Sequence, residues 1–99
     1  MSKVLSTKEV TKKLESLPGW SLRKPKIIRT FSFEEFIDGI DFVQKVSIIA
    51  QKANHHPDIN IRFNKVTMSL TSHDSGGITS KDVTMAEKCD EIYFAMMNA

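Results

Sequence analysis

Apolar residues recur at helical spacing near the start of the chain. Ser6-Thr7-Lys8-Glu9 has the sequence of a capping box, in which a serine and a glutamate satisfy free backbone N–H groups. Val10, Leu14 and Leu17 follow with the spacing of one helix face. Proline and glycine at positions 18–19 interrupt helices, so the pattern predicts a short helix that ends near Leu17.

A longer helical pattern occupies the middle of the chain. Ser32 and Glu35 have capping-box spacing, which predicts that Ser32 caps the helix. Phe31 and Phe36 stand at the positions of a hydrophobic staple, and the pattern continues to about Asn54. The apolar positions form a broad stripe, which consists of Phe36, Ile37, Ile40, Phe42, Val43, Val46, Ile49, Ala50 and Ala53.

A third helix is predicted at the C-terminal end of the chain. Thr79-Ser80-Lys81-Asp82 is another capping-box sequence, and the helical pattern runs to about Met97. Its inward-facing positions are expected to be Val83, Ala86, Cys89, Tyr93 and Met96.

Strict alternation of apolar and polar residues predicts a β-hairpin between the second and third helices. The two strands cover 59–63 and 66–70, and a turn at Asn64-Lys65 places apolar pairs on one face. The pairs are Phe63 with Val66, Ile61 with Met68, and Ile59 with Leu70. Carrying this register past the hairpin brings His73 near His56, so histidines distant in sequence become neighbours.

Two further short strands are expected near 20–24 and 27–32, with a turn at Pro25-Lys26. The order of elements is then α-β-β-α-β-β-α. That order predicts an α+β fold in which three helices pack on one face of a four-stranded antiparallel sheet. A chain of 99 residues is expected to form one domain over 1–99.

Composition narrows the class of function. Basic and acidic residues are interleaved and the net charge is only +2, so no basic stripe predicts nucleic-acid binding. The single cysteine, Cys89, rules out an intrachain disulfide. The N-terminal residues lack the apolar run of a signal peptide, and no stretch is long enough for a membrane span. We expect a cytoplasmic protein, with an organelle or the nucleus as alternatives.

The candidate chemistry lies in the three histidines, His55, His56 and His73. Imidazole exchanges protons near neutral pH, and the carbonyl end of a helix favours its protonated form. Pro57 is expected to end the second helix, which puts His55 and His56 at that end. The set therefore indicates a site for proton transfer on a small molecule.

Plainer interpretations remain for the same residues. His55 and His56 could simply be polar residues at a helix stop. The histidines could also bind a metal, with Asp58 or Asp74 as a carboxylate ligand, although no histidine or cysteine pair has helical ligand spacing. Asp82 is fully explained by its capping-box position.

Several motifs together resemble the pterin-4a-carbinolamine dehydratases over most of the chain. These motifs are Leu17-Pro18-Gly19-Trp20, Phe31-Ser32-Phe33, Asn54-His55-His56-Pro57, Phe63-Asn64-Lys65-Val66, Ser72-His73-Asp74, Gly76-Gly77-Ile78-Thr79 and Asp82. The resemblance implies a dehydratase that removes water from 4a-hydroxytetrahydrobiopterin and gives quinonoid dihydrobiopterin, without a metal or other cofactor.

The resemblance also implies roles for individual residues. His55 and His73 are the expected acid and base, in an order that the sequence leaves open. Substrate binding is expected from His56, Pro57, Asp82 and Gln51. The family usually has an acidic residue where this chain has Gln51, one turn before His55, and a glutamine cannot carry charge.

The family further implies particular partners. Its members form homodimers or homotetramers, partly through helices, and some animal members bind a homeodomain transcription factor. A second hypothesis is therefore an interaction module whose pterin site is vestigial. Neither hypothesis implies direct contact with nucleic acid or with a membrane.

Overall fold

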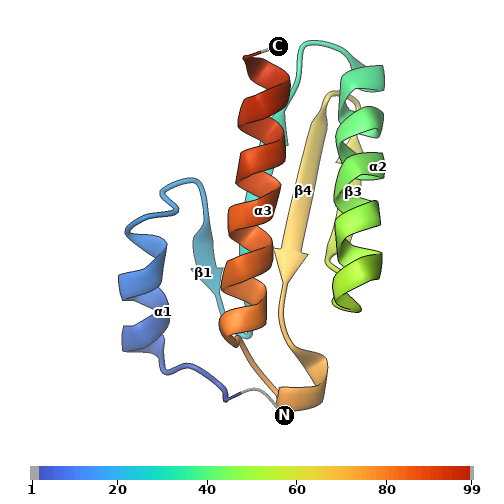
Figure 1. Cartoon of the computed structure of the whole chain (residues 1–99). Helices are drawn as coiled ribbons and strands as arrows, with labels where there is room; N and C mark the ends of the chain where they lie inside the picture. Colours follow the sequence, from blue (N-terminus) through green and yellow to red (C-terminus); the bar gives the residue numbers. More distant parts are fainter. Residues whose placement is uncertain (1–2, 99) are drawn as a thin grey trace.

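A computed structural model describes residues 3–98 of the chain. Its elements follow the predicted order and define an α+β fold (Figure 1). The elements are α1 (Thr7–Leu14), β1 (Ser21–Arg23), β2 (Lys26–Ser32), α2 (Phe36–Ala53), β3 (Asp58–Arg62), β4 (Lys65–Leu70), the 3₁₀-helix η1 (His73–Ser75) and α3 (Ser80–Met97). None of the helices in this part of the chain is long and apolar enough to cross a membrane.

The strands form one antiparallel sheet in the order β1-β2-β4-β3. Helices α2 and α3 lie side by side against one face of this sheet, and α1 packs beside β1 (Figure 1). Strand β4 is therefore central, while β3 is an edge strand whose residues are all exposed. The chain leaves β4 at the same end of the molecule where α2 ends and α3 begins.

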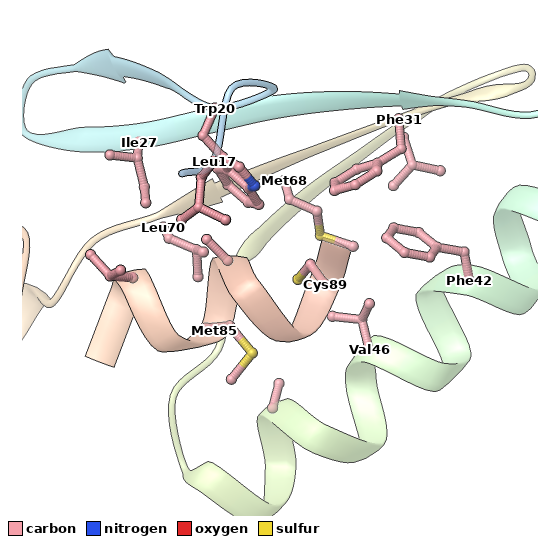
Figure 2. Close-up of a cluster of buried hydrophobic side chains, with 14 of the residues drawn as sticks. Leu17, Trp20, Ile27, Phe31, Phe42, Val46, Met68, Leu70, Met85 and Cys89 are labelled. Atoms are coloured by element: carbon pink, nitrogen blue, oxygen red, sulfur yellow. The ribbon is translucent and has the colours of Figure 1, made fainter. Parts of the chain in front are cut away.

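The core lies between the sheet and the two long helices (Figure 2). Met68 of β4 points toward Cys89 of α3, and both side chains are fully buried. Phe31 and Phe42 join β2 to α2, with ring centroids 4.7 Å apart. Burial of each large apolar side chain contributes roughly 1.5–3 kcal/mol, so this layer fixes the position of the helix ends.

Helices α1 and α3 begin as the capping boxes predict. The backbone N–H of Glu9 donates to Ser6 Oγ at 3.1 Å, and the Glu9 carboxylate accepts from the N–H of Ser6 at 2.9 Å. In α3, Thr79 is the N-cap, and Asp82 completes the box. The predicted inward residues of α3 are either buried or packed against the core.

The predicted start of α2 is wrong. Ser32 does not cap this helix because it belongs to β2, where it pairs with Lys65. The N-cap is Glu35, whose backbone N–H donates to the Asp38 carboxylate at 3.2 Å. Phe31 is buried in the core, whereas Phe36 is 48% exposed, so the pair forms no staple.

The predicted apolar stripe of α2 also needs correction. The core-facing line runs through Phe42, Val46 and Ala50, which are buried. By contrast, Ile37 is 63% exposed and points away from the core. The stripe is therefore wider than the surface that the sheet and α3 cover.

The hairpin has a register two residues away from the predicted one. Ile61 pairs with Val66 and Ile59 with Met68, and the turn is Phe63-Asn64 instead of Asn64-Lys65. A shift by two keeps the same residues on the same face, so alternation alone cannot separate the two registers. The preference comes from a contact outside the hairpin, because the Asn64 side-chain amide donates to the carbonyl of Phe33 at 2.8 Å.

The turn between β1 and β2 differs by one residue from the prediction. Lys26 already pairs with Arg23 at the start of β2, so the turn consists of Lys24-Pro25.

Candidate functional site: a histidine-lined cavity

Three separate segments meet at one end of the molecule and enclose a cavity of about 290 Å³. They are the end of α2, the loop that follows β4, and the start of α3 (Figure 1). The lining residues are Asn54, His55, His56, Thr71, Ser72, His73, Asp74, Ser75 and Lys81. All three histidines of the chain thus reach one cavity.

The end of α2 directs the two adjacent histidines to different partners. Asn54 is the C-cap and has a φ of 50°, in the left-handed region that asparagine tolerates better than most residues. Its backbone N–H still bonds to the carbonyls of Ala50 and Gln51. The chain then leaves the helix axis, so His55 reaches toward α3 and His56 turns back toward α2.

His55 is bound to a buried carboxylate of α3. Its Nε2 lies 2.6 Å from Oδ1 of Asp82, and the Asp82 side chain is completely buried. An ionised carboxylate only accepts hydrogen bonds, so Nε2 of His55 carries the proton of this bond. The remaining ring nitrogen, Nδ1, is then the atom that can take up or release a proton.

Asp82 keeps its place through a chain of hydrogen bonds. Its Oδ2 accepts from the backbone N–H of Thr79 at 2.9 Å and from the Ser72 hydroxyl at 2.8 Å. Because the Ser72 proton goes to Asp82, the 2.8 Å contact between the Ser72 and Thr79 hydroxyls is donated by Thr79. Asp82 is therefore a helix cap, as its capping-box position predicts, and also the hydrogen-bond partner of His55, which the sequence did not indicate.

His56 has a neutral partner. Its Nε2 lies 3.0 Å from Oε1 of Gln51, one turn back on α2. The sequence places Gln51 on the same helix face as His55, but the left-handed turn at Asn54 gives this contact to His56 instead. Gln51, one turn before His55 in the sequence, therefore contacts the next histidine in the chain.

His73 opens the short helix η1 and lines the same cavity. The loop is closed by backbone bonds between Ser72 and Gly77, with the N–H of Ser72 donating to the Gly77 carbonyl at 3.0 Å. Gly76 ends η1 with a φ of 81°, which a residue without Cβ adopts readily. Continuation of the observed register places Thr71 across from His56, and His73 comes two residues later.

Sequence reasoning missed part of the lining. Thr71, Ser75 and Lys81 had no assigned role, although Lys81 carries a cation into the cavity wall. One clue was available, because a lysine in the first turn of a helix lies against the positive end of the helix dipole. Conversely, Pro57 and Gln51 are not among the lining residues.

The alternative of a metal site finds little support in the donor geometry. Within residues 3–98, no three histidine, cysteine or acidic side chains gather in an arrangement that could hold a metal ion. The carboxylate nearest to His55 is already occupied by Ser72 and Thr79. What this arrangement offers instead is a set of imidazole groups held at fixed positions around a small cavity.

Comparison with known proteins identifies the family. Residues 3–92 match the sequence profile described as pterin 4 alpha carbinolamine dehydratase. A protein of Sulfurisphaera tokodaii, named "Putative pterin-4-alpha-carbinolamine dehydratase", is 47% identical over 91% of this chain and 97% of its own length. A protein of Koribacter versatilis with the same name is 45% identical, over 94% of this chain and 99% of its own length. The chain therefore belongs to the pterin-4a-carbinolamine dehydratase family.

Solved structures agree with this assignment. The crystal structure of a transcriptional coactivator/pterin dehydratase from Brucella melitensis matches with a TM-score of 0.88 and 30% identity, covering 92% of this chain and 99% of that one. A pterin dehydratase-like protein described as a RuBisCO assembly factor in the alpha-carboxysome shares the fold, with a TM-score of 0.61 and 17% identity over 75% of this chain and 86% of its own.

Proposed function

We propose that this protein removes water from a pterin-4a-carbinolamine such as 4a-hydroxytetrahydrobiopterin and releases the quinonoid dihydropterin. In this elimination the C4a–O bond breaks, N5 loses its proton, and a C4a=N5 double bond forms. The hydroxyl takes up a proton and leaves as water. Electrons are only redistributed within the ring, so the step consumes no oxidant or reductant.

The observation that carries this proposal is the pairing of His55 with buried Asp82 beside a cavity that His73 also lines. The elimination needs one group that gives a proton to the departing hydroxyl and another that takes the N5 proton. We assign these two roles to His55, through Nδ1, and to His73. Proton transfer by positioned groups typically contributes ~10²–10⁴-fold to a rate.

The other site residues are proposed to bind or to position. His56 contacts the substrate from the cavity wall, and Asp82 positions His55. Gln51 and Pro57 lie outside the lining, so we propose that they act through His56: Gln51 by its hydrogen bond, and Pro57 by fixing the chain between His56 and β3.

The direct test follows absorbance while purified protein is mixed with freshly generated 4a-hydroxytetrahydropterin. We expect the carbinolamine to disappear faster than in a matched solution without enzyme. The variant Gln44→Ala, on α2 but outside the cavity, serves as a control that should keep full activity. A rate equal to the spontaneous one at high protein concentration would refute the dehydratase proposal.

A homo-oligomer is proposed alongside this activity. Ile37 and Ile48 are 63% and 53% exposed on α2, which leaves apolar surface that a second copy could cover. Light scattering should give the mass of a dimer or tetramer, and Ile37→Asp with Ile48→Asp should lower it. A monomeric wild-type protein would contradict the proposal.

An interaction module is the second candidate function. It is favoured by the Brucella melitensis relative, which is described as a transcriptional coactivator as well as a pterin dehydratase. Under this alternative the protein would bind the dimerisation segment of a homeodomain transcription factor and show no dehydration above the spontaneous rate. Sedimentation of the mixed proteins, beside the absorbance assay, separates the two candidates.

A further inference from the structure

We propose that a second cavity, next to the histidine cavity, binds an anionic side chain of the pterin substrate through Lys81 and Lys88. The inference rests on the proposed function for the pterin ring, and it adds the chemical class of the substituent that the ring carries. This substituent ends in a phosphate or a carboxylate group, since the ammonium group of lysine binds both.

The second cavity has a volume of about 210 Å³ and lies between the end of α2 and the start of α3, two helices that run side by side (Figure 1). Its lining includes Ala53, His55, Ser80, Lys81, Thr84 and Lys88. His55 and Lys81 also line the histidine cavity, so the two cavities meet at these residues. A substituent on a ligand in the histidine cavity therefore has a short route into the second cavity.

Two cations lie along the α3 side of the second cavity. Lys81 and Lys88 are two turns apart on this helix, which places them on one face and separates them by roughly 10 Å along the axis. Thr84 lies between them, and with Ser80 it adds hydroxyl groups that can donate to an anionic oxygen. This spacing suits an anionic side chain that extends along the helix.

Carboxylates do not neutralise these cations. Among the described residues that line the second cavity none is acidic, and within residues 3–98 neither lysine forms an ion pair. Asp82 is bonded to His55, Asp74 lines only the histidine cavity, and the exposed Glu87 lies outside both linings. The second cavity therefore carries positive charge that a ligand can balance.

The chemistry of the pterin ring places its side chain at the boundary between the two cavities. In a pterin the side chain is attached to C6, and C6 is bonded to N5. The proposed reaction removes the N5 proton, so the reacting edge of the ring and the side chain are neighbours. His55, which we assign to that edge, is also a wall of the second cavity.

The first experiment compares pterins that differ in the charge of the side chain. Calorimetry measures the affinity for 7,8-dihydroneopterin, for its phosphate ester and for 7,8-dihydrofolate, whose side chain ends in carboxylates. We expect the wild type to bind at least one anionic pterin about tenfold more tightly than dihydroneopterin, because each of two exposed ion pairs contributes a few-fold. Raising the salt concentration should reduce this preference, since salt screens exposed charges.

Variants of the two lysines identify the residues responsible. Lys88→Gln should lower the ratio of anionic to neutral affinity by about threefold, and Lys81→Gln with Lys88→Gln should bring it close to one. The control Lys12→Gln makes the same charge change on the exposed part of α1, outside both cavities, and should keep the wild-type ratio. A preference for only one of the two anionic pterins assigns the side chain as a phosphate or as a carboxylate.

Equal affinity of the wild type for all three pterins would overturn the inference and leave the dehydratase proposal intact. A preference that Lys88→Gln retains in full would overturn it as well.

The second experiment needs no pterin. Inorganic pyrophosphate is titrated into the wild type and Lys88→Gln while the backbone amide chemical shifts of residues 80–88 are followed. We expect saturable shifts in the wild type that weaken in Lys88→Gln. If no pterin binds, the proposed function fails, and the pyrophosphate titration still decides the anion site: identical titrations for the two proteins, or no shifts in either, would refute it.

Discussion

His55 and His56 are neighbours in the chain, and both form a hydrogen bond through Nε2, but their partners differ in charge and in burial. His55 is held by Asp82, a completely buried carboxylate on another helix. His56 is held by Gln51, an exposed and uncharged amide on the helix that it follows. The difference arises at Asn54, whose left-handed conformation sends the two side chains in separate directions. In the function that we propose, two identical residues thus serve proton transfer and ligand recognition in one site.

The largest effect is expected from the partner of His55. Asp82→Ala removes a buried carboxylate that accepts from His55, Ser72 and the Thr79 backbone. These donors would lose their acceptor, so the free energy of unfolding should fall by about 3 kcal/mol, and activity should fall with it. Urea unfolding measures the change, and an unaltered midpoint would show that the buried network contributes little.

Next comes the ring that we assign to proton transfer. His55→Ala should lower kcat by about 10²-fold, because a positioned acid or base is lost. Stability should change much less than in Asp82→Ala, since the side chain reaches the cavity surface. Comparing kcat with KM for His55→Ala and His56→Ala sharpens the contrast between the two histidines. His56→Ala should act mainly on KM, and a larger loss of kcat in His56→Ala than in His55→Ala would reverse our assignment.

The amide partner should have a smaller effect. Gln51→Leu removes one exposed hydrogen bond, worth about 1 kcal/mol, which corresponds to roughly a fivefold change in pterin affinity. The unfolding free energy should stay close to wild type because Gln51 is on the surface. Calorimetric binding checks this prediction, and a loss as large as that of Asp82→Ala would remove the distinction between the two partners.

The smallest change is expected at Cys89, which, like Asp82, is a completely buried ionisable residue of α3. Burial, with a smaller contribution from the negative charge of Asp90, raises the pKa of the Cys89 thiol to about 12. At pH 8 the native thiol is therefore protonated and poorly reactive. Iodoacetamide should leave the folded protein and its activity unchanged, while the urea-unfolded chain reacts quickly. Rapid labelling of the native protein would contradict the buried placement of Cys89.

Much of the fold is encoded in local patterns. The capping boxes at Ser6 and Thr79 predict the starts of α1 and α3 correctly, because the hydrogen bonds of each capping box lie within one helical turn. Where the prediction for α2 failed, a distant contact decided the outcome. Ser32 pairs with Lys65 of β4, and this pairing keeps Ser32 in a strand.

The site shows the same limit of local reasoning. The convergence of His56 and His73 on one cavity was expected, although the register used to derive it was two residues off. The partner of His56 could not be read from helical spacing, because one left-handed residue changes the direction of everything after it. Lys81 was missed since its only local clue is an unfavourable position at a helix start.

The central claim is that this histidine cavity dehydrates a pterin carbinolamine. The measurement that tests it most directly is the stopped-flow rate of carbinolamine loss with the wild type and with the double variant His55→Ala/His73→Ala, both shown to be folded. Our account predicts acceleration by the wild type and a rate near the spontaneous one for the double variant. Equal acceleration by both proteins would contradict the account.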